Sequence, residues 1–238
     1  MRLHPRHSWS VTPEEAVALQ KELRSQVVSD RPIDLDAVRL VAGVDVSVKD
    51  GMSQAAVVVA TFPDFQVVET VRAQRPTPFP YVPGLLSFRE GPVLEEAFER
   101  LEAEPDVFLF DGMGIAHPRR CGIASHLGLW LERPTIGCGK TLLTGRYRDL
   151  PQEKGSMAPL IHRGETIGVA LRTRTGTNPM IISPGHLADI PTAADFVMRC
   201  APKYRLPQPI RLAHNAAGEF MIASSRAADR AGACSAGN

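Results

Sequence analysis

A run of four apolar residues, Val107 to Phe110, is the feature that most constrains the fold of this chain. Two of the four are aromatic, and an apolar run without alternation predicts a strand that is buried on both faces. Asp111 and Gly112 follow the run directly. Open α/β sheets place their chemistry at the carboxyl ends of parallel strands, so Asp111 is a candidate functional residue. A lone aspartate here can also serve only to cap the next turn, so its interpretation depends on its neighbours.

The segments around this run alternate between strand and helix patterns. Three apolar segments with short connections, Leu40–Val48, Gln54–Phe62 and Phe65–Ala73, predict an antiparallel meander. A capping box at Thr12 to Glu15 predicts the start of a helix. Further helices are expected over residues 87–103, 122–131 and 192–200, and further strands over 134–137, 166–172 and 180–183. This order predicts an α/β fold with a mixed β-sheet flanked by helices.

Two stretches are expected to lack regular structure. Residues 75–84 contain four prolines, and this density predicts a stiff loop. From Ser224 onward the chain consists of Ala, Ser, Gly and Arg with single Asp, Cys and Asn residues and no large apolar side chain. We therefore expect a disordered tail at 224–238 and a single catalytic domain over 1–223.

Charge and cysteine content limit the classes of partner. The formal net charge is +1, so a nucleic acid would have to be held by a local basic patch. Candidates for that patch are Arg89, Arg119, Arg120, Lys140, Arg146 and Arg148. The four cysteines show neither a CxxC pair nor metal-ligand spacing, which favours reduced thiols. Without a membrane-length apolar run or a signal-peptide core, we expect a soluble, cytoplasmic protein with no membrane partner.

Three carboxylates form a candidate metal site. Asp45 interrupts the apolar strand Leu40–Val48, Glu90 lies where the next helix begins, and Asp111 ends the central strand. A buried ionised carboxylate is costly unless it is paired, hydrogen-bonded or bound to a metal. Together the three can form an all-oxygen site, which suits Mg²⁺ and phosphodiester cleavage. Two structural roles stay open: Asp45 on a solvated face or paired with an arginine, and Glu90 as a favourable charge at a helix N-terminus.

Four motifs then carry a resemblance that goes beyond spacing. Residues 80–90, PYVPGLLSFRE, resemble a motif of the endonuclease V family. Residues 110–112 with Gly114 and residues 117–128, HPRRCGIASHLG, resemble a second motif. Residues 134–137 with Lys140, and residues 205–214, resemble two more. The resemblance covers about residues 10–215 and implies a ribonuclease H-like fold.

The resemblance also implies an activity and its catalytic residues. The family cuts nucleic acid near deaminated adenine with Mg²⁺, and we expect Mn²⁺ to be able to replace it. Carried over by motif, Asp45, Glu90 and Asp111 would bind the metal. His214 would position the attacking water or a second metal, and Lys140 would contact the phosphate. The cut would fall at the second phosphodiester bond 3′ to deoxyinosine, leaving 3′-hydroxyl and 5′-phosphate ends.

Substrate recognition is implied for a second group of residues. The Pro-Tyr-Val-Pro stretch would act as a wedge, because prolines order the loop and an aromatic ring can replace a lost stacking partner. A damaged base costs less to extrude than a paired one. The base pocket would use mainly main-chain groups, and His117 is a candidate phosphate contact. The expected substrate-binding residues are Pro80, Tyr81, Val82, Pro83, Gly84, Leu86, Gly112, His117, Ile123 and Gly137.

The chain departs from the family pattern at two places. Met113 stands where the family usually has Asn, and Cys138-Gly139 stands where Val-Ala is common. Neither change removes a proposed ligand, but both are expected to alter the rate and the base preference.

The resemblance points to inosine as the lesion but leaves open whether DNA or RNA carries it. We expect a monomeric DNA repair endonuclease whose partner is DNA containing deoxyinosine. The first alternative is an endoribonuclease specific for inosine in RNA, since the choice between DNA and RNA depends on contacts to the 2′-hydroxyl group. The second alternative is a lesion-binding protein without catalysis, against which the intact Asp45, Glu90 and Asp111 argue.

Overall fold

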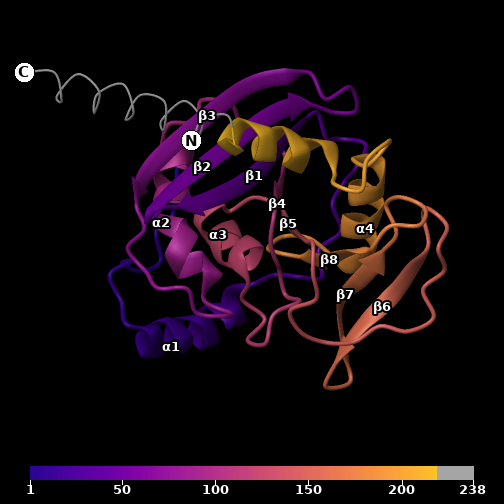
Figure 1. Ribbon diagram of the computed structural model, residues 1–238, viewed down its shortest axis with the longest axis horizontal. Helices are drawn as coiled ribbons and strands as arrows, with labels where there is room; N and C mark the ends of the chain where they lie inside the picture. The colour runs from indigo at the N-terminus through magenta and orange to yellow at the C-terminus, as the bar shows by residue number, and fades with distance from the viewer. Residues whose placement is uncertain (219–238) are drawn as a thin grey trace, which may run out of the picture.

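An eight-stranded sheet forms the centre of the protein in the computed structural model, which describes residues 1–218 (Figure 1). Its strand order is β3-β2-β1-β4-β5-β8-β7-β6. The strands are β1 (Leu40–Lys49), β2 (Met52–Thr61), β3 (Val67–Pro76), β4 (Val107–Phe110), β5 (Thr135–Gly139), β6 (Met157–His162), β7 (Glu165–Leu171) and β8 (Met180–Pro184). The helices are α1 (Pro13–Leu23), η1 (Arg24–Gln26), α2 (Leu86–Glu99), α3 (Ile123–Leu131), α4 (Ile190–Arg199) and a last helix over 208–218.

Strand pairing confirms the expected mixed sheet. Strands β1, β2 and β3 form an antiparallel meander. Strand β1 also pairs in parallel with β4, and β4 pairs in parallel with β5. The remaining strands β8, β7 and β6 continue the sheet with antiparallel pairing. The strands β1 and β4 therefore lie side by side at the centre, with their carboxyl ends at the same edge.

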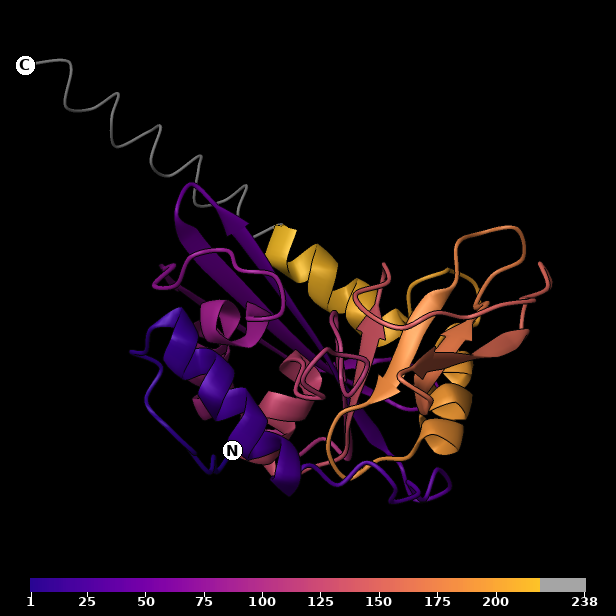
Figure 2. The same cartoon turned by 90° about the horizontal axis from the view of Figure 1, so that it is seen from below.

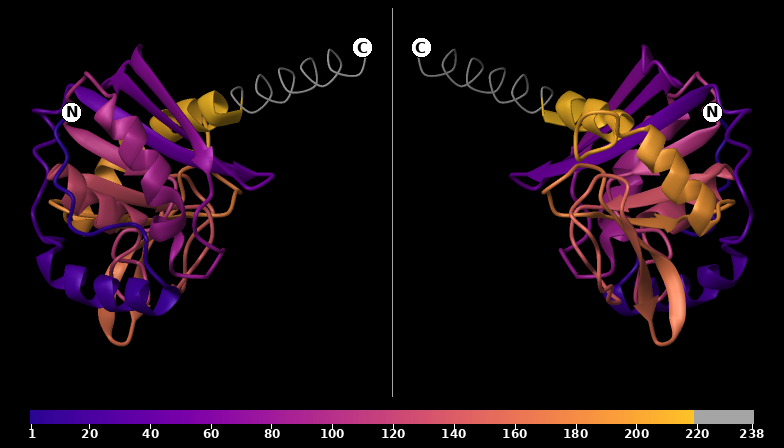
Figure 3. Two further views of the ribbon diagram at one scale, coloured as in Figure 1. Left: turned by 90° about the vertical axis from the view of Figure 1, so that its left-hand side faces the viewer. Right: turned by 90° about the vertical axis from the view of Figure 1, so that its right-hand side faces the viewer.

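Helices cover both faces of the sheet (Figures 2 and 3). On one face α2 and α3 bury Val93, Leu94, Phe98 and Leu127 against alternate residues of β1, β2 and β4. On the other face α4 and the helix over 208–218 pack on β1, β4, β5 and β8. Helix α1 crosses beside α2 and α3, and it begins with the predicted capping box between Thr12 and Glu15.

Several boundaries differ from the sequence-based expectation. Strand β6 was not predicted, and Arg75 and Pro76 belong to β3 rather than to the loop. Helix α4 begins at Ile190, because Asp189 and not Thr192 caps it. The helix over 208–218 was also not predicted. The tail expected at 224–238 lies outside the described residues.

None of the helices in residues 1–218 has the length and apolar content needed to cross a lipid bilayer.

Candidate active site

Asp45 and Asp111 lie side by side at the centre of the sheet. The parallel register pairs Val44 of β1 with Phe110 of β4, so the next residue of each strand is an aspartate. The Asp111 amide donates a hydrogen bond to the Val44 carbonyl over 3.0 Å, which extends the pairing to this point. Asp45 is only 8% exposed. The sheet topology alone thus brings together two carboxylates that are 66 positions apart in the chain.

Burial, and after it the crowding of negative charge, determines the electrostatics of these carboxylates. Burial raises the pKa of Asp45 from 3.8 to about 6, and the nearby Asp111 carboxylate adds to the rise. Burial also raises the pKa of Glu90 well above its ordinary value, with further contributions from Asp45 and Asp111. Like charges that disfavour each other's ionised form must lie close together. The three predicted carboxylates therefore share one electrostatic site.

Two basic side chains contact the carboxylates. Lys140 follows β5, and its Nζ forms an ion pair with the Asp111 carboxylate. His214 lies on the helix over 208–218, and its Nδ1 lies 3.0 Å from Oδ2 of Asp45. That helix approaches β1 closely, because a Cβ atom on Gly43 would come within 1.9 Å of the Pro209 carbonyl oxygen. Gly43 therefore allows the contact that brings His214 to Asp45.

The chemistry of this donor set fits a divalent ion. Carboxylate oxygens are the ligands that Mg²⁺ prefers, and a bound cation would offset both the burial and the Asp111 charge that raise the pKa of Asp45. The Lys140 ammonium already lies against Asp111, where positive charge is favoured. Within the described chain, no three His, Cys, Asp or Glu side chains are arranged to hold one ion. The Asp45–Asp111 pair, with Glu90 close enough to share its field, is therefore the feature that carries a metal hypothesis.

A cavity of about 310 Å³ adjoins the carboxylates. Asp111 and Lys140 form part of its wall. The segment 80–84, here called the recognition loop, and the start of α2 form the opposite wall. Seven more of the expected substrate-binding residues line it: Val82, Pro83, Gly84, Leu86, Gly112, His117 and Ile123. Its volume lies near the lower end of the range of small-molecule pockets.

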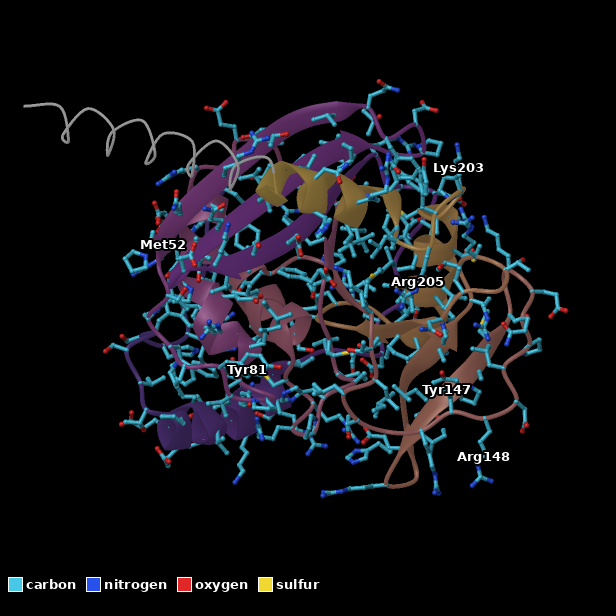
Figure 4. The ribbon with its side chains drawn as sticks, in the orientation of Figure 1. Met52, Tyr81, Tyr147, Arg148, Lys203 and Arg205 are labelled. Atoms are coloured by element: carbon cyan, nitrogen blue, oxygen red, sulfur yellow. The ribbon has the colours of Figure 1, made fainter. Side chains whose placement is uncertain are left out.

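Tyr81 also borders this cavity but extends into solvent. It is 73% exposed, on the side of the molecule that carries α1 and α2 and away from Arg205 (Figure 4). Pro80 is exposed beside it. An exposed aromatic ring at the rim of a cavity is free to contact a ligand. Gly137 does not line the cavity. A Cβ atom at this position would lie 2.2 Å from the Gly114 nitrogen, so Gly137 packs directly behind the cavity wall.

The expected phosphate contact by His117 stays a prediction, and in this structure both ring nitrogens contact the protein. Its Nδ1 accepts a hydrogen bond from the Arg119 amide over 3.2 Å, so Nε2 carries the hydrogen and donates to the Gly84 carbonyl over 2.9 Å. Burial lowers the pKa of His117 to about 4, which keeps the ring neutral. His126 is completely buried and is a core imidazole.

Three arginines of the expected basic patch have structural partners. Arg89 donates to the Phe79 carbonyl over 2.7 Å, and Arg119 donates to the Gly84 carbonyl. Arg120 is buried and pairs with Glu165 over 2.8 Å. Only Arg146 and Arg148 of this set are exposed, and both border a second hollow beside β6; Figure 4 shows Arg148 well apart from Tyr81.

Sequence reasoning missed Gln20, which lines the cavity from α1. It is 1% exposed, and it occupies the buried face of α1 together with Ala16 and Leu23. The sequence did carry an indication of this role, because Gln20 is a polar residue four positions after Ala16 in an otherwise apolar stripe of the helix. Ser87 was missed too; it also lines the cavity, and its Oγ lies 2.8 Å from Nδ1 of the buried His126.

A mixed sheet that presents two aspartates beside a cavity of about 310 Å³ is the arrangement expected of a nuclease with a ribonuclease H-like fold. Comparison with known proteins identifies the family. The family described as Endonuclease V matches residues 21–215. An endonuclease V from Nostoc punctiforme is 53% identical over 215 residues, which cover 90% of this chain and 97% of that protein. The chain belongs to the endonuclease V family.

Solved structures agree with this assignment. The crystal structure of endonuclease V from Streptomyces avermitilis has a TM-score of 0.86 and 40% identity, and the match covers 92% of this chain and 96% of that one. The Ciona intestinalis endonuclease V has a TM-score of 0.76 and 28% identity over 88% of this chain and 97% of that one. That protein was crystallised with a 24mer DNA containing an inosine followed by a ribo-adenosine. Family members are nucleases that generally need a divalent metal.

Proposed function

We propose that this protein is a DNA repair endonuclease that recognises deoxyinosine and hydrolyses the second phosphodiester bond 3′ to it. One observation carries the proposal: Asp111 and Lys140 belong both to the acidic centre and to the wall of the cavity. A base held in the cavity would therefore keep its own strand beside the carboxylates. The inosine-containing DNA bound by the Ciona intestinalis protein supports this lesion as the ligand.

The recognition loop would act on the base. Extrusion leaves a gap in the stack, and the exposed Tyr81 ring can fill it with an aromatic face. Pro80 and Pro83 restrict the backbone on either side of Tyr81 and Val82, so little conformational freedom is lost when DNA binds. The cavity wall offers main-chain groups of Leu86, Gly112 and Ile123, and the amide of Gly84, to the base edge, whereas Gly137 holds that wall in place.

The acidic centre would act on the phosphate. We propose that Asp45 and Asp111 bind Mg²⁺, or Mn²⁺ in its place, and that Glu90, which already lies in their electrostatic field, moves in to complete the ligand set when the ion binds. When bound there, a divalent ion supplies positive charge to the phosphate and acidity to water. Lys140 places an ammonium group at the same edge and can bind a phosphate oxygen.

His214 is positioned for proton transfer. With its Nδ1 hydrogen directed to Asp45, its Nε2 carries a lone pair that can orient or deprotonate the attacking water. Attack by water on phosphorus with departure of the 3′ oxygen leaves a 3′-hydroxyl and a 5′-phosphate. We further propose that the protein acts as a monomer, with residues 1–223 as its single catalytic domain.

Strand-cleavage mapping tests this function directly. Purified protein is incubated with an end-labelled duplex that contains one deoxyinosine, with Mg²⁺ or with a chelator, beside the same duplex containing deoxyadenosine. We expect a single Mg²⁺-dependent cut at the second bond 3′ to the lesion. Sealing of the product nick by a DNA ligase would identify the 3′-hydroxyl and 5′-phosphate ends. The variant Asp111→Ala should bind the duplex without cutting it.

Two other outcomes would replace the proposal. A lesion-specific complex that never cuts would identify a lesion-binding protein. Faster cleavage of a matched inosine-containing RNA at the same salt concentration would identify an endoribonuclease. The RNA arm is needed because the DNA bound by the Ciona intestinalis relative itself carries a ribonucleotide after the inosine.

A further inference from the structure

The carbonyl oxygen of Gly84, at the end of the recognition loop, accepts hydrogen bonds from three side chains. Gln20 donates from Nε2 over 3.0 Å, Arg119 from Nη2 over 2.8 Å, and His117 from Nε2 over 2.9 Å. A carbonyl oxygen has two lone pairs, so three donors leave no capacity for a ligand. This carbonyl is therefore an anchor of the loop and not a group that reads the base.

Gln20 is the centre of this anchor. Its Oε1 accepts a hydrogen bond from Nε of Arg119 over 2.5 Å, and its Nε2 also donates to the Cys121 carbonyl over 3.0 Å. One buried amide thus joins α1, the recognition loop and the turn that leads into α3. Both ends of the amide are satisfied, as a buried polar group requires. Gln20 also orients Arg119, which itself donates to Gly84.

The anchored peptide controls where the recognition loop lies. Gly84 has a φ of +81°, a left-handed conformation that reverses the chain between the loop and α2. Tyr81 lies three positions before it, and the Leu85 amide closes the turn by donating to the Val82 carbonyl over 2.9 Å. Since the prolines keep this short segment stiff, a displacement of Gly84 moves Tyr81 and the cavity wall together.

We infer that Gln20 is a positioning residue that holds the recognition loop in the conformation needed to extrude the lesion. This inference rests on the proposed function. The packing of α1 alone does not explain why position 20 carries an amide side chain, because Ala16 and Leu23 already bury the apolar face of that helix. An apolar residue of the same length would pack equally well and would leave the Gly84 carbonyl without its α1 partner.

The test compares Gln20→Met with the wild type on two substrates. The first is a duplex with a paired deoxyinosine, and the second is the same strand unpaired, in which the base needs no extrusion from a duplex. Under single-turnover conditions we expect the protein concentration for half-maximal rate to rise about tenfold on the duplex, the size of one or two lost hydrogen bonds. On the unpaired strand, the protein concentration for half-maximal rate should rise much less. The maximal rate should stay near that of the wild type.

A spectroscopic measurement reports extrusion without cleavage. A 2-aminopurine placed next to the deoxyinosine should brighten when the wild type binds and unstacks the duplex. It should brighten less with Gln20→Met at equal saturation. Arg119→Lys supplies a second variant that leaves α1 intact: it keeps the charge, but one ammonium cannot reproduce the separate donors to Gln20 and Gly84. It should show the same substrate dependence.

Val197→Ala is the matched control. Val197 is fully buried in α4 on the opposite face of the sheet, so its truncation lowers stability without touching the anchor. It should leave the ratio between the two substrates unchanged. An equal loss on both substrates, or unchanged fluorescence in both anchor variants, would overturn the inference. Absence of cleavage by the wild type would instead refute the proposed function.

Discussion

Replacing Asp45 with asparagine should stabilise the metal-free protein at neutral and alkaline pH. The pKa of Asp45 rises from 3.8 to about 6, first because of burial and then because of Asp111. The folded protein thus binds the Asp45 proton more tightly than the unfolded chain does. Ionised Asp45 therefore destabilises the fold. This cost is absent below pH 3.8, grows as the pH rises, and is complete above about pH 6.

The structure sets the size of this effect. A rise from 3.8 to about 6 corresponds to about 3 kcal/mol at 1.36 kcal/mol per pKa unit. Asparagine has the shape of the aspartate and lacks its charge, and its Oδ1 can still accept from His214. We therefore expect Asp45→Asn to raise the free energy of unfolding by up to about 3 kcal/mol at pH 8 and by little at pH 4.

Urea unfolding in the presence of a chelator measures this difference at both pH values. Asp195→Asn is the control, because Asp195 is an exposed residue of α4 in an ion pair with Arg199, and its replacement should change stability by less than about 0.5 kcal/mol. Added Mg²⁺ should reduce the difference in free energy of unfolding between Asp45→Asn and the wild type at pH 8. An ion at 100 times its dissociation constant stabilises the wild type by about 2.7 kcal/mol. A gain that is equal at both pH values, or a loss at pH 8, would refute the electrostatic reasoning.

Three further outcomes are expected. Lys140→Met should slow single-turnover cleavage about 100-fold, the typical effect of removing one group that stabilises developing charge; an unchanged rate would exclude a phosphate contact. Tyr81→Ala should weaken binding to a deoxyinosine duplex at least about tenfold in a titration by fluorescence anisotropy, because base stacking is worth about 1–3 kcal/mol, whereas Tyr81→Phe should bind normally. Gly139→Ala should lower the free energy of unfolding in urea by less than about 1 kcal/mol, because the atom that its Cβ would meet at 2.3 Å is the terminal Cε of Met113, which can move aside; Gly137→Ala, whose Cβ would lie 2.2 Å from the Gly114 nitrogen, should cost about 1–3 kcal/mol or more, and an equal loss in the two variants would contradict this reasoning.

The Asp45–Asp111 pair could be predicted because local patterns locate the strand on which each aspartate lies. The apolar run before Asp111 required a buried strand, and the apolar residues around Asp45 required a second one. If the first strand of the meander is central in the sheet, it can lie next to the strand that precedes Asp111. The structure has this arrangement, and the pairing of Val44 with Phe110 puts the two aspartates at the same level. The conformation of each strand depends on its own residues, so their carboxyl ends could be located from the sequence.

The elements that escaped prediction depend on tertiary contacts. Strand β6 contains Pro159, which argues against a strand in general, but β6 lies at the edge of the sheet, where a missing amide costs little. The helix over 208–218 starts at a proline-rich segment, and the close approach of Pro209 to Gly43 fixes its place. His117 has the sequence context of a ligand contact, yet its nitrogens are used by the distant Gly84 and the nearby Arg119. No local pattern distinguishes these cases.

In the proposed function, the end of β4 would connect recognition of the base with cleavage. Asp111 faces the acidic centre, and the next two residues, Gly112 and Met113, already line the cavity. Under the proposed function, a base in the cavity and a phosphate at Asp111 would be held by adjacent peptide units, so one short segment would fix the distance between lesion and cut. The Gly84 anchor, in contrast, belongs to a separate loop. Changes that shift β4 should therefore impair binding and cleavage together, whereas changes at Gln20 should impair only the capture of the base.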